Sequence, residues 1–413
     1  MNLLFLVHRF PYPPNKGDKT STYNMLKYFS RSWRIFLGGF VDQPDDWKYL
    51  SKVEKFCAEA HFVPIDPRTR KLASLSGLLT GEPLTNVYYR NGSLQQWVNL
   101  VLAKYDIDAI LVFSGCMAQY VVGKVPSGAR SMFDPEDVDS EKWQALAKSA
   151  RWPRAWLYRR EARKVFEFER QMAKSFDVSV FVTENEAELF KTLAPEVAPR
   201  VTFRTQGVDA DYFDPSLEFD SPYPDGTRAL AFIGVMDYWP NVEAVNWFAR
   251  DAFPQVRRAV HGAEFYIVGL NPSPDVRRLA ETKGVHVTGG VADVRPYLQH
   301  AWAACLPLRT ARGIQNKVLE AMAMEKPVIA SPEAMTGINA AADFAPLVAE
   351  TAADFAHAAI GLLHQDRRRE PAARTFVREH FNWDTNLRRF EALLAAPTAP
   401  AAREERSPTT RVA

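Results

Sequence analysis

Short apolar runs alternate along the first half of the chain with segments in which apolar residues recur at helical spacing. The apolar runs predict strands near Leu3 to Val7, Ile35 to Phe40, Ala60 to Pro64, Ala109 to Phe113, Arg130 to Phe133 and Val178 to Val182. The intervening segments predict helices, notably Asp18 to Ser30, Leu94 to Lys104 and one long helix near Ser140 to Ser175. This alternation is typical of βαβ units and a parallel sheet.

The same alternation starts again in the second half of the chain, which predicts a second α/β domain. Its strands are expected at Arg228 to Ile233, Glu264 to Val268, His286 to Thr288, Ala303 to Pro307 and Val328 to Ala330. Between the halves, Phe213 to Thr227 carries three prolines and four acidic residues with little periodicity, as expected of an exposed linker.

These changes of pattern set the expected domain boundaries. The first domain covers residues 1–205, a linker covers 206–227, and the second domain covers 228–375. A helix is expected in 376–396. Residues 397–413 are polar and proline-bearing without an apolar period, so we expect them to be disordered.

Composition narrows the classes of function. Hydrophobic residues make up 47% of the 413 residues, enough for two cores, and 51 basic against 49 acidic residues provide no field that would attract nucleic acid. Three distant cysteines predict neither a disulfide framework nor a zinc cluster, and they fit a reducing cytoplasm. No run approaches the roughly 20 apolar residues of a membrane span, so any membrane contact is expected to be peripheral.

One segment of the second domain combines groups that suit a nucleotide. Residues 309–330 read RTARGIQNKVLEAMAMEKPVIA, with a glycine loop before a helix that starts near Gln315. Gly313 allows backbone amides to approach a phosphate at the helix N-terminus, and Lys317 adds a mobile cation. Glu320, one turn further on, suits two ribose hydroxyls. The alternative is an ordinary amphipathic helix with Lys317 and Glu320 in solvent.

Three segments, in order, resemble glycosyltransferase family four, a retaining family with the GT-B fold. GIQNKVLEAMAMEKPVIAS resembles its donor-site signature, QGVDADYFDP at 206–215 resembles its interdomain motif, and Phe232-Ile-Gly234 resembles the strand and glycine that open its donor domain. Within that family the chain resembles bacterial enzymes found with exopolysaccharide and exosortase (PEP-CTERM) systems, through PPNKGDK at 13–19 and DPEDVDSEKW at 134–143.

The resemblance implies two Rossmann-like domains that face a cleft, with the last helix packed back across both. It implies transfer of a sugar from a nucleoside-diphosphate sugar to a saccharide or polyprenyl-linked saccharide acceptor, with retention at the anomeric carbon. The implied donor-binding residues are Gly17, Gly234, Val291, Arg309, Arg312, Gly313, Ile314, Asn316, Lys317 and Glu320. No cofactor and no metal are implied, because the helix dipole and basic side chains offset the leaving diphosphate.

The chain departs from the family pattern in two places. Arg312 replaces the first glutamate of the donor signature, and residues 235–241 lack the usual Arg and Lys, so Lys317, Arg309 and Arg312 are expected to supply the positive charge. Where many relatives carry a catalytic histidine, this chain reads MFDPED at 132–137. Asp134 is its nearest equivalent, and Asp137 is a second catalytic candidate.

We expect the Asp134 carboxylate to face the cleft, where it orients an acceptor hydroxyl or stabilises positive charge at the anomeric carbon. The alternative role is a cap of the helix that starts near Asp139 or Ser140. His8 ends the first strand, either lining the cleft or acting structurally.

Residues 148–164, KSARWPRAWLYRREARK, hold seven basic residues and one acidic residue with interleaved aromatic residues. This composition suits the headgroup layer of an anionic membrane, which predicts a cytoplasmic protein on the inner face of the membrane. The alternative is a solvated helix with packed aromatic residues. The expected contact residues are Arg151, Trp152, Arg154, Trp156, Arg159 and Arg160.

Two rival functions remain open at this point. A nicotinamide-dependent oxidoreductase would need GxGxxG directly after the first strand, where the chain reads PYPPNKGDK at 11–19. A catalytically silent sugar-nucleotide-binding or scaffold subunit is allowed by Arg312 and by the absence of the catalytic histidine.

Overall fold

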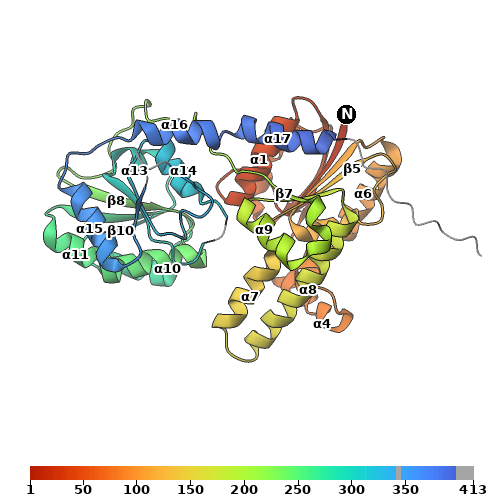
Figure 1. Ribbon diagram of the computed structural model, residues 1–413, viewed down its shortest axis with the longest axis horizontal. Coiled ribbons are helices and arrows are strands. Elements are labelled where there is room, and N and C mark those ends of the chain that lie inside the picture. The colour runs from red at the N-terminus through yellow and green to blue at the C-terminus, as the bar shows by residue number, and fades with distance from the viewer. Residues whose placement is uncertain (312, 341–345, 397–413) are drawn as a thin grey trace, which may run out of the picture.

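The computed structural model describes residues 1–311, 313–340 and 346–396. Two lobes lie side by side, and each is built on its own parallel sheet covered by helices (Figure 1). Arg312 and the expected disordered tail, 397–413, lie outside the described residues.

The first lobe holds a seven-stranded parallel sheet in the order β3-β2-β1-β4-β5-β6-β7. Its strands are β1 (Asn2–Val7), β2 (Arg34–Val41), β3 (Glu59–Pro64), β4 (Ala109–Phe113), β5 (Arg130–Glu136), β6 (Val178–Phe181) and β7 (Val201–Phe203). Successive side chains of a strand point to opposite faces, so Leu3 and Phe5 enter one core cluster while Leu4 and Leu6 enter another. The apolar runs of the sequence therefore form a sheet that is buried on both faces.

Helices cover both faces of this sheet. They are α1 (Gly17–Phe29), α2 (Leu50–Glu54), α3 (Pro67–Ser74), α4 (Gly77–Thr80), α5 (Leu84–Tyr88), α6 (Gly92–Lys104), α7 (Asp139–Ser149), α8 (Arg154–Ser175) and α9 (Glu184–Leu193), with 3₁₀ turns η1 (Pro44–Tyr49), η2 (Gly115–Tyr120) and η3 (Pro195–Arg200). The prediction of a single long helix near Ser140 to Ser175 is wrong. This segment forms two helices, because Pro153 has no backbone N–H to continue the helical bonding.

The second lobe holds a six-stranded parallel sheet in the order β10-β9-β8-β11-β12-β13. Its strands are β8 (Arg228–Ile233), β9 (Ala263–Val268), β10 (Val285–Gly289), β11 (Ala303–Leu306), β12 (Val328–Ala330) and β13 (Leu347–Val348). The helical elements are α10 (Trp239–Trp247), η4 (Phe248–Ala252), α11 (Phe253–Ala259), α12 (Pro274–Arg278), η5 (Leu279–Glu281), α13 (Arg295–His300), α14 (Asn316–Ala323), α15 (Ala352–Leu363) and α16 (Pro371–His380). One hydrophobic cluster fills this lobe.

The chain crosses between the lobes twice. The second crossing joins α16, which packs in the core of the second lobe, to α17 (Trp383–Ala395), whose Leu387 and Phe390 lie in the core of the first. The two helices run in sequence along one edge of both lobes (Figure 1). The crossings contact each other at Gly207, where a Cβ atom would stand 2.6 Å from the Trp383 ring. Glycine is required there because the backbone lies directly against that ring.

The segment expected to be an exposed linker is only partly exposed. Phe213 and Tyr223 are buried in the second core, and the Tyr223 hydroxyl donates a hydrogen bond to the carbonyl oxygen of Tyr297 at 2.7 Å. The proline-rich composition identified irregular backbone, but it did not show that two aromatic side chains hold this backbone against the lobe.

Candidate functional site

The loop after β11 turns sharply into helix α14. Gly313 has φ of 62°, in the left-handed region that residues with a Cβ rarely adopt. Helix α14 follows at Asn316, and its N-cap residue, Gln315, makes no side-chain cap hydrogen bond. The amides at the start of α14 thus present donors and a positive dipole end to a ligand.

Lys317 and Glu320 lie one turn apart on α14. Lys317 Nζ donates a hydrogen bond to Asn241 Oδ1 at 2.6 Å, so the ammonium is held in place rather than mobile as expected. Burial lowers the pKa of Lys317 to about 8, although the negative charge of Glu320 acts to raise it. Burial raises the pKa of Glu320 to about 7, and among the described residues its carboxylate accepts no hydrogen bond. This carboxylate is available to donors from a ligand.

Two glycines fix the backbone at the ends of β8 and β9. A Cβ atom on Gly234 would stand 2.8 Å from Asn241 Nδ2, and one on Gly269 would stand 1.7 Å from the Gly234 carbonyl oxygen. Asn241 Nδ2 donates in turn to the carbonyl oxygen of Val235 at 2.9 Å. Gly234 therefore brings the backbone close to Asn241, and Asn241 holds Lys317.

Asp134 does not face the space between the lobes as expected. It is fully buried within β5, and Arg204 Nε, also buried, donates to its Oδ2 at 2.6 Å. The expectation fails because alternate residues of a strand point to opposite sides, and the side of Asp134 is enclosed by Arg204. It does not cap α7 either, since its Oδ1 accepts from the amide of Glu136 at 3.1 Å.

Asp137 is the carboxylate at the end of β5 that reaches the other lobe. A Cβ atom on Gly313 would stand 3.3 Å from Asp137 Oδ1, so this oxygen lies against the donor loop. Its Oδ2 pairs with Lys142 at 2.9 Å, while Oδ1 is buried and has no hydrogen-bond partner among the described residues. An unpaired buried oxygen is costly unless a ligand supplies a donor.

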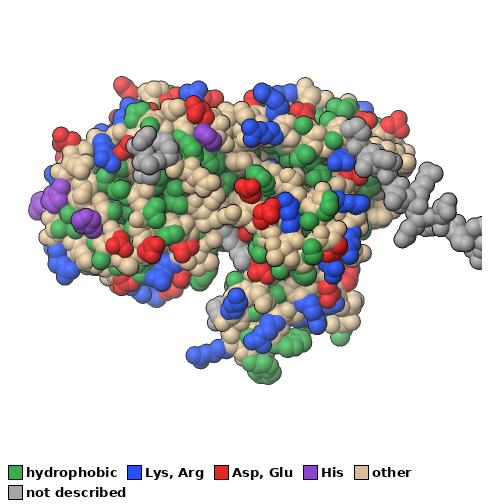
Figure 2. Space-filling model, viewed as in Figure 1, with side chains coloured by type: hydrophobic (Ala, Val, Ile, Leu, Met, Phe, Trp, Pro, Cys, Tyr) green, Lys and Arg blue, Asp and Glu red, His purple; other side chains and the backbone are tan. Residues whose placement is uncertain are grey.

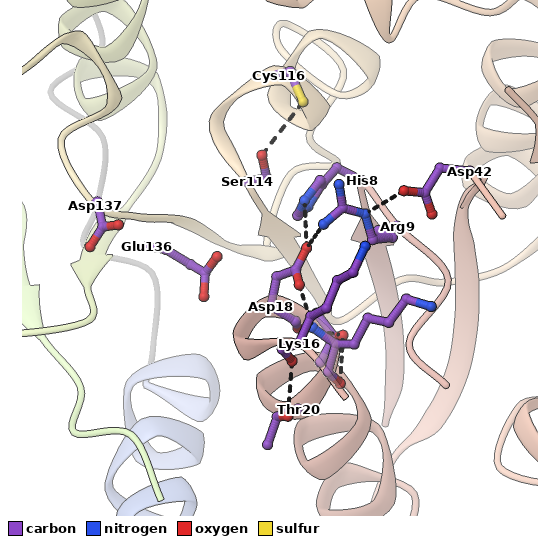
Figure 3. Close-up of polar contacts among 12 residues, drawn as sticks. His8, Arg9, Lys16, Asp18, Thr20, Asp42, Ser114, Cys116, Glu136 and Asp137 are labelled. Carbon is purple, nitrogen blue, oxygen red and sulfur yellow. Dashed lines mark hydrogen bonds and ion pairs between the residues drawn. The ribbon is translucent and has the colours of Figure 1, made fainter. Parts of the chain in front are cut away.

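Glu136 precedes Asp137 and adopts a strained conformation. Its φ is 68°, which is uncommon for a residue with a Cβ. Burial raises its pKa well above the ordinary value, and the nearby carboxylates of Asp18, Asp137 and Asp134 act in the same direction. Figure 3 shows its carboxylate between Asp137 and the residues that follow β1.

An ion-pair network follows β1 at the start of α1. Asp18 contacts His8 Nε2 at 3.2 Å and also pairs with Arg9, whose Nε donates to Asp42 at 2.8 Å (Figure 3). Burial works to raise the pKa of Asp18, but the bonds from His8 and Arg9 hold it well below its usual range. Gly17 starts α1 beside this network, with open space where a Cβ would lie. These contacts orient the loop after β1 between the lobes.

The comparisons with known proteins agree with this architecture. Residues 227–365, most of the second lobe, match the model of a family described as "Glycosyl transferases group 1". No curated protein matches the sequence. Sucrose-phosphate synthase from Thermosynechococcus elongatus has a TM-score of 0.68 at 16% identity, over 95% of this chain and 98% of that chain.

Other similar structures cover both lobes as well. HepE of Anabaena, solved in complex with UDP and glucose, has a TM-score of 0.62 at 12% identity, over 95% of this chain and 99% of that chain. WaaG, described as a glycosyltransferase involved in lipopolysaccharide biosynthesis, has a TM-score of 0.63 at 16% identity, over 95% of this chain and all of that one. The chain has the GT-B fold.

In this GT-B structure the other donor-binding residues expected from the sequence do not all lie together at the start of α14. Ile314 is buried beside Gly337, and Asn316 Oδ1 accepts from Gln206 of the interdomain segment at 2.8 Å. Arg309 is exposed and lies over the ring of Trp247 at 5.4 Å. Val291 is partly buried in the second lobe, after β10. Arg312, the remaining donor candidate, lies outside the described residues.

Five of the six residues expected to touch a membrane are exposed, namely Arg151, Trp152, Arg154, Trp156 and Arg159. Arg160 is the exception. Its guanidinium donates to the carbonyl oxygens of Gly77 and Glu82 and pairs with Glu161, so it joins α8 to α4. The described residues contain no helix long and apolar enough to cross a membrane. They also contain no group of three His, Cys, Asp or Glu placed to hold a metal.

Sequence reasoning missed three residues that shape this GT-B site. Asn241 orients Lys317, Arg204 pairs with Asp134, and Asp18 organises the loop after β1. Asn241 lies in the very segment, 235–241, that was noted for lacking basic residues. Its role depends on a contact 76 positions along the chain, which no local pattern shows.

Proposed function

We propose that this chain is a retaining glycosyltransferase of family four that moves a sugar from a nucleoside-diphosphate sugar to a saccharide acceptor, without a metal cofactor. The observation that carries the proposal is the placement of Asp137 of the first lobe against Gly313 of the loop that leads to Lys317 and Glu320. The match of residues 227–365 to a glycosyltransferase family supports it.

Each group has a proposed task on the donor. The first amides of α14 and Lys317 offset the charge that develops on the leaving diphosphate, and Glu320 accepts hydrogen bonds from the ribose hydroxyls. Lys317 is oriented for this by Asn241, at 2.6 Å. The bond between the anomeric carbon and the diphosphate oxygen breaks, the acceptor oxygen bonds to the same face of the sugar, and the proton of the acceptor hydroxyl passes to the leaving diphosphate.

Asp137 is the proposed catalytic carboxylate of the first lobe. Its Oδ1, to which none of the described residues donates, would accept a hydrogen bond from the acceptor hydroxyl or stabilise the positive charge at the anomeric carbon. It thereby takes the role first expected of Asp134. We further propose that the acceptor is a lipid-linked saccharide of exopolysaccharide synthesis at the cytoplasmic face of a membrane, supported by the resemblance to PEP-CTERM-associated enzymes and by the basic residues 148–164.

The proposal is tested with a panel of nucleotide sugars. Thermal shift selects the donor, since a ligand that binds only the folded state stabilises it, and release of nucleoside diphosphate then measures hydrolysis and transfer. We include UDP-glucose because HepE was solved with it. Binding without hydrolysis or transfer would favour the silent donor-binding subunit. Loss of transfer in EDTA, with recovery in magnesium or manganese, would contradict the metal-independent mechanism.

A further inference from the structure

The first lobe exposes an apolar surface on two separate pieces of the chain. The α3–α4 segment, 67–81, exposes Leu72, Leu75, Leu78 and Leu79, the last at 92%. The α7–α8 turn, 144–160, exposes Leu146, Trp152 and Trp156, with Trp152 at 84%. These are seven of the nineteen large hydrophobic side chains that are exposed in the described part of the chain, and they come from only 32 positions.

The two pieces lie side by side. Arg160 of α8 donates to the carbonyl oxygen of Gly77, the first residue of α4, and Glu161 accepts from the amide of Leu84 at 2.7 Å. Trp156 lies one turn before Arg160, on the same side of α8. The exposed tryptophans therefore continue the exposed leucines, and we call the whole the leucine–tryptophan surface. Figure 1 shows α4 beside the projecting α7–α8 hairpin.

Charge decides what this surface fits. Its two segments contain eight Lys and Arg residues and no Asp or Glu. Arg151, Arg154 and Arg159 are exposed around the tryptophans, and Arg68 and Lys71 are exposed around the leucines. Figure 2 shows basic and apolar side chains together at the tip of the hairpin.

We infer that the leucine–tryptophan surface docks the first lobe on a bilayer with anionic headgroups. Leucine side chains enter the edge of the acyl region, tryptophan rings lie at the headgroup level, and the basic residues contact lipid phosphates. This chemistry fits a membrane better than an acidic protein groove, because exposed leucines on α4 and tryptophans on the hairpin, surrounded by cations on both pieces, are the composition of an interfacial anchor. The two pieces provide two contacts, so the lobe has a fixed orientation on the membrane.

Flotation of the full-length protein with vesicles tests this inference. We expect binding to vesicles that contain phosphatidylglycerol, little binding to phosphatidylcholine alone, and loss of most binding when salt rises from about 0.1 M to about 1 M, which shortens screening from about 10 Å to about 3 Å. The double variant Leu78→Ser, Leu79→Ser should bind at least about tenfold more weakly, because two apolar side chains are lost from the contact. Arg151→Gln with Arg154→Gln should lower binding chiefly at low salt.

Leu100→Ser is the matched control, since Leu100 is 66% exposed on α6, apart from this surface. It should bind as the unchanged protein does, and all variants should keep their melting temperature and donor hydrolysis. Equal flotation of the Leu78/Leu79 variant and the unchanged protein would overturn the inference. So would absence of binding to anionic vesicles, or a dimer that the same variant dissociates. Hydrolysis without flotation would contradict this inference and the proposed membrane location of the acceptor, but not the proposed sugar transfer. Flotation without hydrolysis would contradict the proposed sugar transfer, on which this inference does not depend.

Discussion

The Asp137 carboxylate lies against Gly313, although the two residues belong to different lobes. A Cβ atom at Gly313 would stand 3.3 Å from Asp137 Oδ1 and 3.3 Å from Val182 Cγ1. The contact joins the end of β5 to the loop that leads into α14, so a change on either side affects both the fit of the lobes and the candidate site.

Gly313→Ala should destabilise the protein by about 1 kcal/mol or more, because alanine is strained at φ of 62° and its methyl group contacts Asp137. It should also weaken donor binding. Urea unfolding and nucleotide titration measure the two effects. Gly361→Ala is the control: Gly361 lies in α15 with open space around it, so alanine should stabilise the protein by about 0.5–1 kcal/mol. Equal effects of the two variants would argue against the special role of Gly313.

Asp137→Asn should lower turnover by roughly 100-fold while donor affinity stays nearly constant, because the amide keeps the shape but loses the charge near the anomeric carbon. Steady-state kinetics together with nucleotide titration separate binding from chemistry. Asp139→Asn offers a comparison, since Asp139 shares Lys142 with Asp137 at 2.9 Å. Near-normal turnover of the Asp137 variant would remove it from the reaction and direct attention to Glu136.

Asp134→Ala should cost about 3–5 kcal/mol of stability, because it leaves the buried guanidinium of Arg204 with only its longer contact to Glu136, at 3.9 Å. The double variant Asp134→Leu, Arg204→Met should recover much of this loss, since a buried ion pair replaced by apolar residues is often neutral. Chemical unfolding provides the measurement. A stable Asp134→Ala protein with lost turnover would instead restore the catalytic role that the burial of Asp134 contradicts.

Glu320→Gln should strongly reduce the thermal shift produced by a nucleoside diphosphate, because ribose hydroxyls lose a charged acceptor. Glu333→Gln serves as the control, since Glu333 is exposed in the same lobe. An unchanged shift in the Glu320 variant would show that the nucleotide binds elsewhere.

The pH dependence of donor binding should follow Lys317 and Glu320. Affinity should rise as pH passes about 7, where Glu320 ionises, and fall above about 8, where Lys317 loses its proton. Calorimetric titration across this range would measure both the rise and the fall of donor affinity. In Glu320→Gln the rise of affinity near pH 7 should be absent. A flat profile would contradict the assignment of these two groups to the donor.

The same shift of the Glu320 pKa predicts how stability varies with pH. The folded protein keeps this proton up to about pH 7, whereas a carboxyl group with the ordinary value of 4.5 loses it earlier. Between these values the folded state binds more protons, so the free energy of unfolding should fall as pH rises and then level off. Glu320→Gln should flatten this part of the curve, which urea unfolding at several pH values would measure.

The sequence by itself determined two α/β domains with parallel sheets, and the resemblance of three segments to a known family implied the GT-B fold. Apolar runs that suit strands buried on both faces, separated by helical periods, specify parallel sheets, and the irregular segment 206–227 separates the two. The local signals also located Gly313, Lys317 and Glu320, because a glycine turn and a helix start are properties of neighbouring residues.

Only the tertiary structure decided which carboxylate of residues 134–137 meets the second lobe. Asp134 and Asp137 are equivalent by composition, yet Arg204 encloses the first while the second lies against Gly313. The partners of Lys317 and Asp134 stand 76 and 70 positions away in the chain. Periodicity reports the neighbours of a residue within one element, whereas burial and ion pairing depend on which elements meet, and that is set by the packing of both lobes.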